Sequence, residues 1–313
     1  MSGIILEKLL IMMIMGLIGF VCGKAGLIDG DTNKRLSNLS LLVVNPLLIF
    51  VSYQMPYSGD IALNLGIVFL FSVFAFVIQL GAALLLVRGK GNPNVGVERM
   101  SLAFSNNGYI GIPLVQGVFG AEGVIYMTMF VTVFNIVLWT VGVLFMTGKT
   151  SFRQAIKNLC SPAIFMVLLG LAFFFFRISL PEIILQPLES VGNMNTPFAM
   201  LIAGATLAGS NLLGCIKKPK LYLLSAAKLL LIPILVVLAM AGFVRLGVDS
   251  MLITITVIAV ACPTAAACTM FAHRYQKDSA YASELFAVTT ILSAATIPAV
   301  IWLLNLLLKL FAA

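Results

Sequence analysis

The sequence predicts an all-α membrane protein with ten transmembrane helices, arranged as two inverted five-helix repeats in which helices 4 and 9 are broken and cross. Three observations predict this fold class: the composition, the series of apolar segments, and two pairs of motifs about 150 residues apart. Of the 313 residues, 61% are hydrophobic and 10% are charged, and the mean hydropathy is +1.11. About a quarter of the residues in soluble domains are charged, so this composition excludes a soluble domain.

Apolar segments follow one another along the whole chain, each long enough to cross a bilayer as a helix of about 20 residues. They lack the alternating pattern of a membrane β-barrel. The first segment, from Ile4 to about Cys22, starts with an acidic residue and a lysine and has no small-residue cleavage site behind it, which predicts a retained span rather than a signal peptide. The ten predicted spans start near Ile4, Asn33, Ile61, Glu98, Gly123, Cys160, Gln186, Leu221, Ser250 and Ala282.

The second and seventh spans are the most polar, and they contain Asn45, Asn193 and Asn195. Polar side chains at membrane depth face protein or water rather than lipid. These asparagines can form an outer wall of a substrate site or a dimer surface, but pairing with neighbouring helices is the favoured interpretation.

Lysine and arginine gather in alternate connections, as the positive-inside rule predicts for cytoplasmic loops. Fourteen of the nineteen lie after spans one, three, five, seven and nine. This bias predicts a multi-pass protein of the bacterial inner (plasma) membrane with both termini periplasmic. The net charge of +8 does not indicate a nucleic-acid partner, because the basic residues are spread over loops too short to fold into a reader.

Shifting the chain on itself by about 150 residues aligns Asn45-Pro46 with Asn195-Thr196-Pro197, and the proline of YIGIP with the proline of AVACP. Five spans per copy is an odd number, so the second copy enters the membrane from the opposite side. The expected domains are a first five-helix repeat at 1–150 and a second, inverted repeat at 151–313.

Span four contains SNNGYIGIPL, residues 105–114, where a membrane helix should be uniformly apolar. Proline removes a backbone hydrogen bond and glycine tolerates non-helical geometry, so we expect the helix to unwind around Gly108 to Pro113. Freed backbone groups at this depth must line a cavity or meet neighbouring protein. The candidate substrate-binding residues in this span are Ser105, Asn106, Asn107, Gly108, Gly111 and Pro113.

Span nine repeats the pattern in VACPTAAACTMFA, which adds Cys262, Pro263 and Thr264 to the candidates. Where two such breaks cross, helix N-termini present N–H groups that favour anions, and unwound carbonyls can attract cations. A lone proline would be read as a structural kink. Two breaks at equivalent positions of the repeats favour a binding site.

Two further polar residues are candidates for the site. Lys228 lies about two turns inside span eight, where it either extends to the interface or faces the transport cavity. Asn135 in span five is a secondary candidate, as interhelical pairing is commoner for such an amide. Acidic residues are almost absent from the span interiors, so a coupling proton or sodium ion would be held by amides and carbonyls or by Lys228, or transport is uncoupled.

No enzymatic constellation is present in the sequence. There is no phosphate-binding glycine loop, no nucleophile with a base and no metal-ligand spacing, so neither catalysis, a metal site nor a cofactor is expected.

The motifs AFSNNGYIGIPLVQGVFG, NTPFAMLIAGATLA and VVNPLLIF together resemble the auxin efflux carrier family, whose bacterial members include malate and malonate permease-like proteins. The resemblance covers essentially the whole chain. It implies a scaffold of spans 1, 2, 6 and 7 and a transport part of spans 3–5 and 8–10. It also implies secondary transport of small organic anions by an elevator-like movement, and a homodimer through the scaffold is expected.

The sequence therefore predicts an inner-membrane secondary transporter of small carboxylates, with dicarboxylates such as malate or malonate as candidates, whose site lies where helices 4 and 9 cross. A sodium-coupled bile-acid-type organic anion symporter shares the ten-helix inverted design and is the nearest alternative. A transporter-like sensor or a passive anion channel would keep the site without alternating access.

Overall fold

The computed structural model describes residues 2–89, 91–148, 162–209 and 218–312, and the regular elements within them are helices. Shorter apolar helices include Pro162–Phe175 and Ser250–Ala261. The helices support an α-helical protein that crosses a membrane several times. Ten spans and two repeats stay a prediction, and the expected repeat boundary at residue 150 lies outside the described residues. The segments long and apolar enough to cross a membrane are Gly30–Ser52, Gly59–Leu86, Asn107–Thr147, Pro219–Leu246 and Ser279–Phe311.

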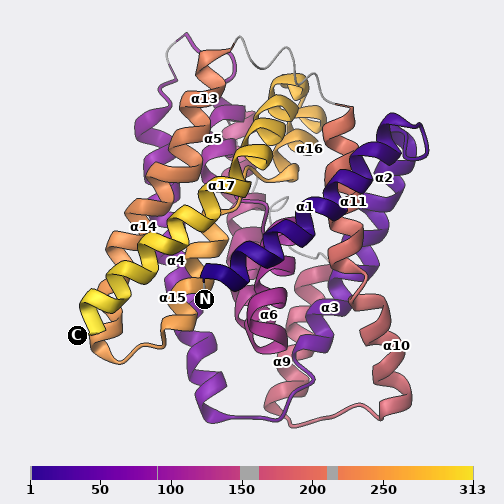
Figure 1. Cartoon of the computed structure of the whole chain (residues 1–313), viewed down its shortest axis with the longest axis vertical. Coiled ribbons are helices and arrows are strands. Elements are labelled where there is room, and N and C mark those ends of the chain that lie inside the picture. The colour runs from indigo at the N-terminus through magenta and orange to yellow at the C-terminus, as the bar shows by residue number, and fades with distance from the viewer. Residues whose placement is uncertain (1, 90, 149–161, 210–217, 313) are drawn as a thin grey trace.

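The first half of the chain forms seven α-helices and three π-helical turns among the described residues (Figure 1). Gly120 interrupts α6 with φ 65° and ψ −153°, a backbone geometry that glycine tolerates because it has no Cβ. The predicted spans four and five meet at this turn. In order, the elements are α1 (Ser2–Lys24), α2 (Gly30–Leu39), η1 (Ser40–Val44), α3 (Asn45–Ser52), α4 (Gly59–Leu86), α5 (Val95–Ala103), η2 (Asn107–Gly111), α6 (Ile112–Val137), η3 (Leu138–Gly142) and α7 (Val143–Thr147).

The second half is also helical wherever it is described. A short break at Asn193 and Met194 separates α10 from α11, and a second one separates α15 from α16. In order, the elements are α9 (Pro162–Phe175), α10 (Glu182–Gly192), α11 (Asn195–Ala208), α13 (Pro219–Ala226), η4 (Ala227–Leu231), α14 (Ile232–Met240), η5 (Ala241–Leu246), α15 (Ser250–Ala261), α16 (Ala266–Arg274) and α17 (Ser279–Ala312).

Three of the π-helical turns stand directly before a proline. η1, η2 and η4 precede α3, α6 and α14, and the second residue of each of these helices is Pro46, Pro113 or Pro233. Proline has no N–H to donate, and its ring collides with the carbonyl four residues earlier. A wider π turn moves that carbonyl away, so each helix continues past its proline instead of ending there.

Glycines bring α1 and α11 into backbone contact, and Figure 1 shows the two helices side by side. A Cβ added at Gly204 would overlap the carbonyl oxygen of Gly16, and one added at Gly19 would overlap the carbonyl of Leu201. Small residues at a helix interface allow this close approach in a bilayer, where van der Waals packing drives association. α1 and α11 correspond to the predicted spans one and seven of the scaffold.

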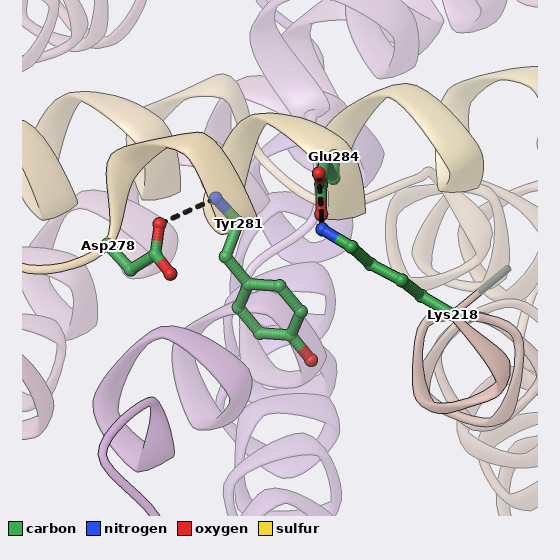
Figure 2. Close-up of polar contacts among 4 residues, drawn as sticks. All are labelled: Lys218, Asp278, Tyr281 and Glu284. Atoms are coloured by element: carbon green, nitrogen blue, oxygen red, sulfur yellow. Dashed lines mark hydrogen bonds and ion pairs between the residues drawn. The ribbon is translucent and has the colours of Figure 1, made fainter. Parts of the chain in front are cut away.

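Ion pairs join the helix ends at the side where α13 and α5 begin, the upper end of Figure 1. Figure 2 shows Lys218 donating to both carboxylate oxygens of Glu284 on α17, at 2.6 and 2.7 Å. At the start of the same helix, Asp278 accepts from the backbone N–H of Tyr281 at 2.9 Å. Lys220 pairs with the buried Glu98 of α5. The start of α13 is thus held to both α5 and α17.

Candidate functional site

Both broken helices open at the same place, where the predicted spans four and nine meet. α5 ends at Ala103, α15 ends at Ala261, and the two extended stretches that follow pair as an antiparallel bridge between Ser105 and Thr264. The N–H of Asn106 donates to the Pro263 carbonyl at 2.8 Å, and the N–H of Ala265 donates to the Phe104 carbonyl at 2.9 Å. Each break therefore supplies the backbone partners that the other lacks, as a non-lipid-facing break in a membrane requires.

The unwound stretch of span four lies earlier than the sequence predicted. We expected it at Gly108 to Pro113, but the helix ends at Ala103 and Asn107–Gly111 is already a π-helical turn. Pro113 follows this π-helical turn within one continuous helix, and the wider turn moves the Tyr109 carbonyl away from the proline ring. The proline therefore opens the turn before it, and the chain leaves helical geometry one turn further back, at the pairing with span nine.

Lys228 of η4 points its ammonium group into the crossing. Its side chain is 1% exposed, and Nζ donates to Ser105 Oγ at 2.6 Å and to the Leu102 carbonyl at 3.2 Å. Ser105 Oγ in turn lies 3.1 Å from the Val260 carbonyl and donates to it. Lys228 thus binds both broken helices through one serine, and in the described part of the chain no carboxylate forms an ion pair with it.

Thr264 holds the other side of the bridge. Its Oγ1 donates to the Ser101 carbonyl at 3.1 Å, and its backbone N–H donates to Thr289 Oγ1 on α17 at 3.2 Å. Cys262 is fully buried beside it in the chain. These contacts join α5, the span-nine break and α17 at one point.

Replacing Thr264 with valine should lower the free energy of unfolding by about 0.6–1.7 kcal/mol, the range for one interhelical hydrogen bond in a membrane protein. The shape of the side chain is kept while the donor to Ser101 is lost. Denaturation of the purified protein in detergent measures the change. Thr140→Val is the control, because Thr140 is partly exposed and bonds carbonyls of its own helix. Equal stabilities of the two variants would contradict the bond to Ser101.

Asn106 and Asn107 begin the helix that leaves the crossing, and they are 4% and 2% exposed. Asn106 Nδ2 and both polar atoms of Asn107 have no hydrogen-bond partner among the described residues. The first N–H groups of a helix also lack partners within it. The start of η2 therefore collects unpaired donors in a buried place.

The two glycines of η2 make room around Asn107. A Cβ at Gly111 would overlap the terminal methyl of Met127 and lie 3.3 Å from Asn107 Oδ1. A Cβ at Gly108 would lie 3.7 Å from Nδ2 of Asn45, which belongs to α3. Asn45 of the predicted span two thus lies close to the backbone of the broken helix.

The sequence interpretation of Asn195 as a structurally paired residue is wrong within the described residues. Asn195 is fully buried, and both polar atoms of its side chain are unpaired, as is Oδ1 of Asn45. Asn193 does pair, since its Oδ1 accepts from Gln116 Nε2 of α6 at 3.1 Å. The signal for Asn45 and Asn195 was present in the repeated asparagine–proline pattern, which marks a π-helical turn in span two and a break in span seven.

Asn135 donates to the Val131 carbonyl of its own helix at 2.9 Å and is half-buried. Its contribution to the site stays a prediction. Gln79 of α4 comes closer to the crossing, because its Oε1 lies 3.5 Å from Ser105 Oγ while its Nε2 is unpaired.

An apolar pocket of about 520 Å³ lies beside η2, the segment that follows the crossing. Its walls come from α1, α11 and α17, and Ile110 of η2 reaches it three residues after Asn107. The lining includes Thr290, whose Oγ1 is buried without a partner among the described residues. Unpaired amides and an apolar space therefore lie on consecutive turns of the same segment.

Comparison with known proteins shows which family the chain belongs to. The model of a family described as membrane transport protein matches residues 4–301. An uncharacterized transporter of Methanocaldococcus jannaschii is 24% identical over 215 residues, which cover 65% of this chain and 69% of that protein. The family match spans nearly the whole chain, so this protein belongs to the membrane transport proteins of the auxin efflux carrier family.

Proposed function

We propose that this protein is a secondary transporter of small organic anions, with carboxylates as substrates and dicarboxylates such as malate or malonate as candidates. The observation that carries the proposal is the pair of buried amide donors, Asn106 Nδ2 and Asn107 Nδ2, at the start of the helix that leaves the crossing. A helix N-terminus carries a partial positive charge, and its free N–H groups bind anions. The substrate carboxylate would accept from these donors and from backbone N–H groups near Gly108.

Lys228 supports an anionic substrate through charge. Its ammonium group is buried at the crossing without a paired carboxylate among the described residues, and a buried cation favours a nearby anion. Nζ already donates to Ser105 and Leu102. We therefore propose that Lys228 holds the break open and contributes a positive electrostatic potential at the crossing. A proton on Lys228 or a sodium ion is a candidate for coupling.

An elevator-like movement is proposed from the unequal bonding of the two parts. Within the transport part, the bridge, the Lys228 contacts and the ion pairs of Glu98 and Glu284 tie its helices together. Across the boundary to the scaffold, Tyr109 donates to the Ser37 carbonyl at 3.4 Å, Gln116 donates to Asn193 at 3.1 Å, and the hydroxyls of Tyr53 and Thr128 are hydrogen-bonded at 2.7 Å. These bonds join uncharged groups, whereas the ion pairs among the described residues lie within the transport part. A body held more strongly within itself than to its neighbour moves as a unit. We place both termini in the periplasm and a homodimer contact on the scaffold.

Asn107→Leu should weaken carboxylate binding at least tenfold, because it removes both the donor and the acceptor of a buried amide while keeping the branching and the number of heavy atoms of the side chain. The measurement is the shift in thermal unfolding of the purified protein against a panel of mono- and dicarboxylates, followed by uptake into proteoliposomes. Asn64→Leu is the matched control, since that amide donates to the Tyr126 hydroxyl on another pair of helices. If carboxylates raise the unfolding temperature of Asn107→Leu as much as that of the unaltered protein, the carboxylate site does not lie at the crossing.

A sodium-coupled organic anion symporter is the second candidate. Unpaired amide oxygens of Asn107 and Asn195 favour it, because carbonyl-type oxygens are ligands of hard cations. Binding of the carboxylate would then require sodium, whereas the proton-coupled or uncoupled transporter binds equally well in potassium.

A further inference from the structure

We propose that Glu98 is a positioning residue for transport, because its ion pair with Lys220 sets where Lys228 meets the crossing. The proposal rests on the proposed function and adds a residue outside the candidate site. Glu98 lies in the first turn of α5, and Lys220 lies in the first turn of α13. Lys228 follows in η4, and its Nζ donates to the Leu102 carbonyl and to Ser105 Oγ where α5 ends.

Two polar contacts therefore join the same two segments at different depths. Lys228 follows Lys220 by eight residues, while Leu102 and Ser105 follow Glu98 by four and seven. At 1.5 Å per residue, the two contacts lie roughly 6–12 Å apart along the helices. The residues at the junction of α13 and η4 have helical dihedral angles, so the two form one continuous helix. A shift of this helix at Lys220 thus moves Lys228 as well.

α5 is held in place on its other sides. A Cβ added at Gly96 would overlap the carbonyl oxygen of Phe145, so α5 is in backbone contact with α7. Arg99 Nε donates to the Val87 carbonyl at the end of α4 at 3.0 Å. The depth of α13 is then set by its own contacts to α5, and Glu98 supplies a charged one at the end that the two helices share.

The Glu98 carboxylate has a fixed direction. The side chain is 2% exposed, and its Oε2 accepts from Asn92 Nδ2 at 2.8 Å. Tyr281, which Figure 2 shows extending from α17, donates its hydroxyl to Oε1 at 3.2 Å. Lys220 is 55% exposed, so water can solvate its ammonium group if the pair is absent. The lysine is therefore drawn to the carboxylate, and α13 moves with it.

Stability alone does not account for such a pair. Removing a carboxylate from water costs free energy that offsets its attraction to a lysine, and replacing a buried ion pair by uncharged residues is often neutral. The best-attested role of buried charged and polar groups is to fix the register of packed helices. Lys228 is only 1% exposed, so a tightly packed interior prevents it from swinging to compensate for a shifted helix.

The test removes the ion pair without leaving a buried charge unpaired. The uncharged-pair variant carries Glu98→Gln and Lys220→Met together, which keeps an acceptor for the Tyr281 hydroxyl. Initial uptake of radiolabelled malate and lactate is measured in proteoliposomes and divided by the amount of reconstituted protein. We expect uptake to fall roughly 3- to 100-fold, since misplacing a group by about 1 Å can cost on the order of 10²-fold.

The matched control removes the other ion pair at this end of the molecule. Lys218→Met with Glu284→Gln separates the start of α13 from α17, and uptake should stay close to that of the unaltered protein. Equal losses in the two double variants would mean that α13 is merely loosened, and would overturn the role of Glu98. In a Lys228→Met background, the uncharged pair should cause no further loss. A further loss by the same factor would also overturn it.

Hydrogen exchange tests the proposal without a substrate. The N–H groups of Asn106 and Ala265 donate across the crossing, and their exchange in lipid nanodiscs, followed by mass spectrometry, reports its opening. The uncharged-pair variant should exchange these amides roughly 2- to 10-fold faster, the factor for the loss of one hydrogen bond. Unchanged exchange would overturn the proposal. If the unaltered protein takes up no acid, the proposed function fails, and the exchange rates still decide whether Glu98 positions Lys228.

Discussion

Gly204→Ala is expected to lower the free energy of unfolding by about 2–3 kcal/mol, because its new methyl group would overlap the Gly16 carbonyl oxygen. Backbone cannot move aside as a flexible side chain can, so α1 and α11 must separate. Separation loses the close van der Waals packing that holds helices together in lipid. Chemical denaturation in detergent measures the change, and it should be the largest effect of any single methyl group on the scaffold.

Gly66→Ala is the matched control for Gly204→Ala. Gly66 lies within the membrane helix α4, and no atom lies within 4 Å of its Cβ position. Alanine is favoured over glycine in helices by about 0.8–1.0 kcal/mol, so this variant should be slightly more stable than the parent protein. If both variants have the same stability, α1 and α11 are not in backbone contact.

Lys228→Met is expected to reduce uptake roughly 10- to 100-fold while the protein still reaches the membrane. The change keeps the length of the side chain but leaves the Leu102 carbonyl and Ser105 Oγ without their charged donor. Hydrogen bonds to charged groups contribute about 1.5–3 kcal/mol, and each 1.4 kcal/mol is a factor of ten. The loss acts where spans four and nine are joined, and it also removes the positive charge near the anion.

Initial uptake rates in proteoliposomes, divided by the amount of reconstituted protein, measure the effect of Lys228→Met. Lys309→Met is the control, since Lys309 lies exposed in the last turn of α17. Normal uptake by Lys228→Met would show that the buried ammonium group takes no part in transport.

The sequence located the two breaks, because proline and glycine act on the backbone locally and in a known direction. It did not locate the unwound residues correctly, since the bridge between Ser105 and Thr264 joins segments far apart in the chain. Local rules predict where a helix is weakened, at Pro113. The distant partner decides where it opens.

The sequence also could not predict which way the Lys228 side chain points. From the pattern alone, a lysine two turns deep either extends to the interface or turns inward, and only the position of Ser105 settles it. Asn195 shows the reverse case, because amides inside membrane helices commonly pair with neighbouring helices, and here its neighbours offer no partner among the described residues. Pairing is a property of the packed structure, so composition and spacing cannot supply it.

The bridge between the two breaks has a consequence for biosynthesis. The Phe104 carbonyl and the Asn106 N–H are paired with Ala265 and Pro263, which are synthesised about 160 residues later. At 5–20 residues per second, span four waits on the order of 8–30 s in the membrane before its partners emerge. During that time its exposed backbone groups are costly in lipid. The first half of the chain is therefore expected to stay beside the insertion machinery, or another polar surface, until the second half arrives, and to be degraded when it is produced alone.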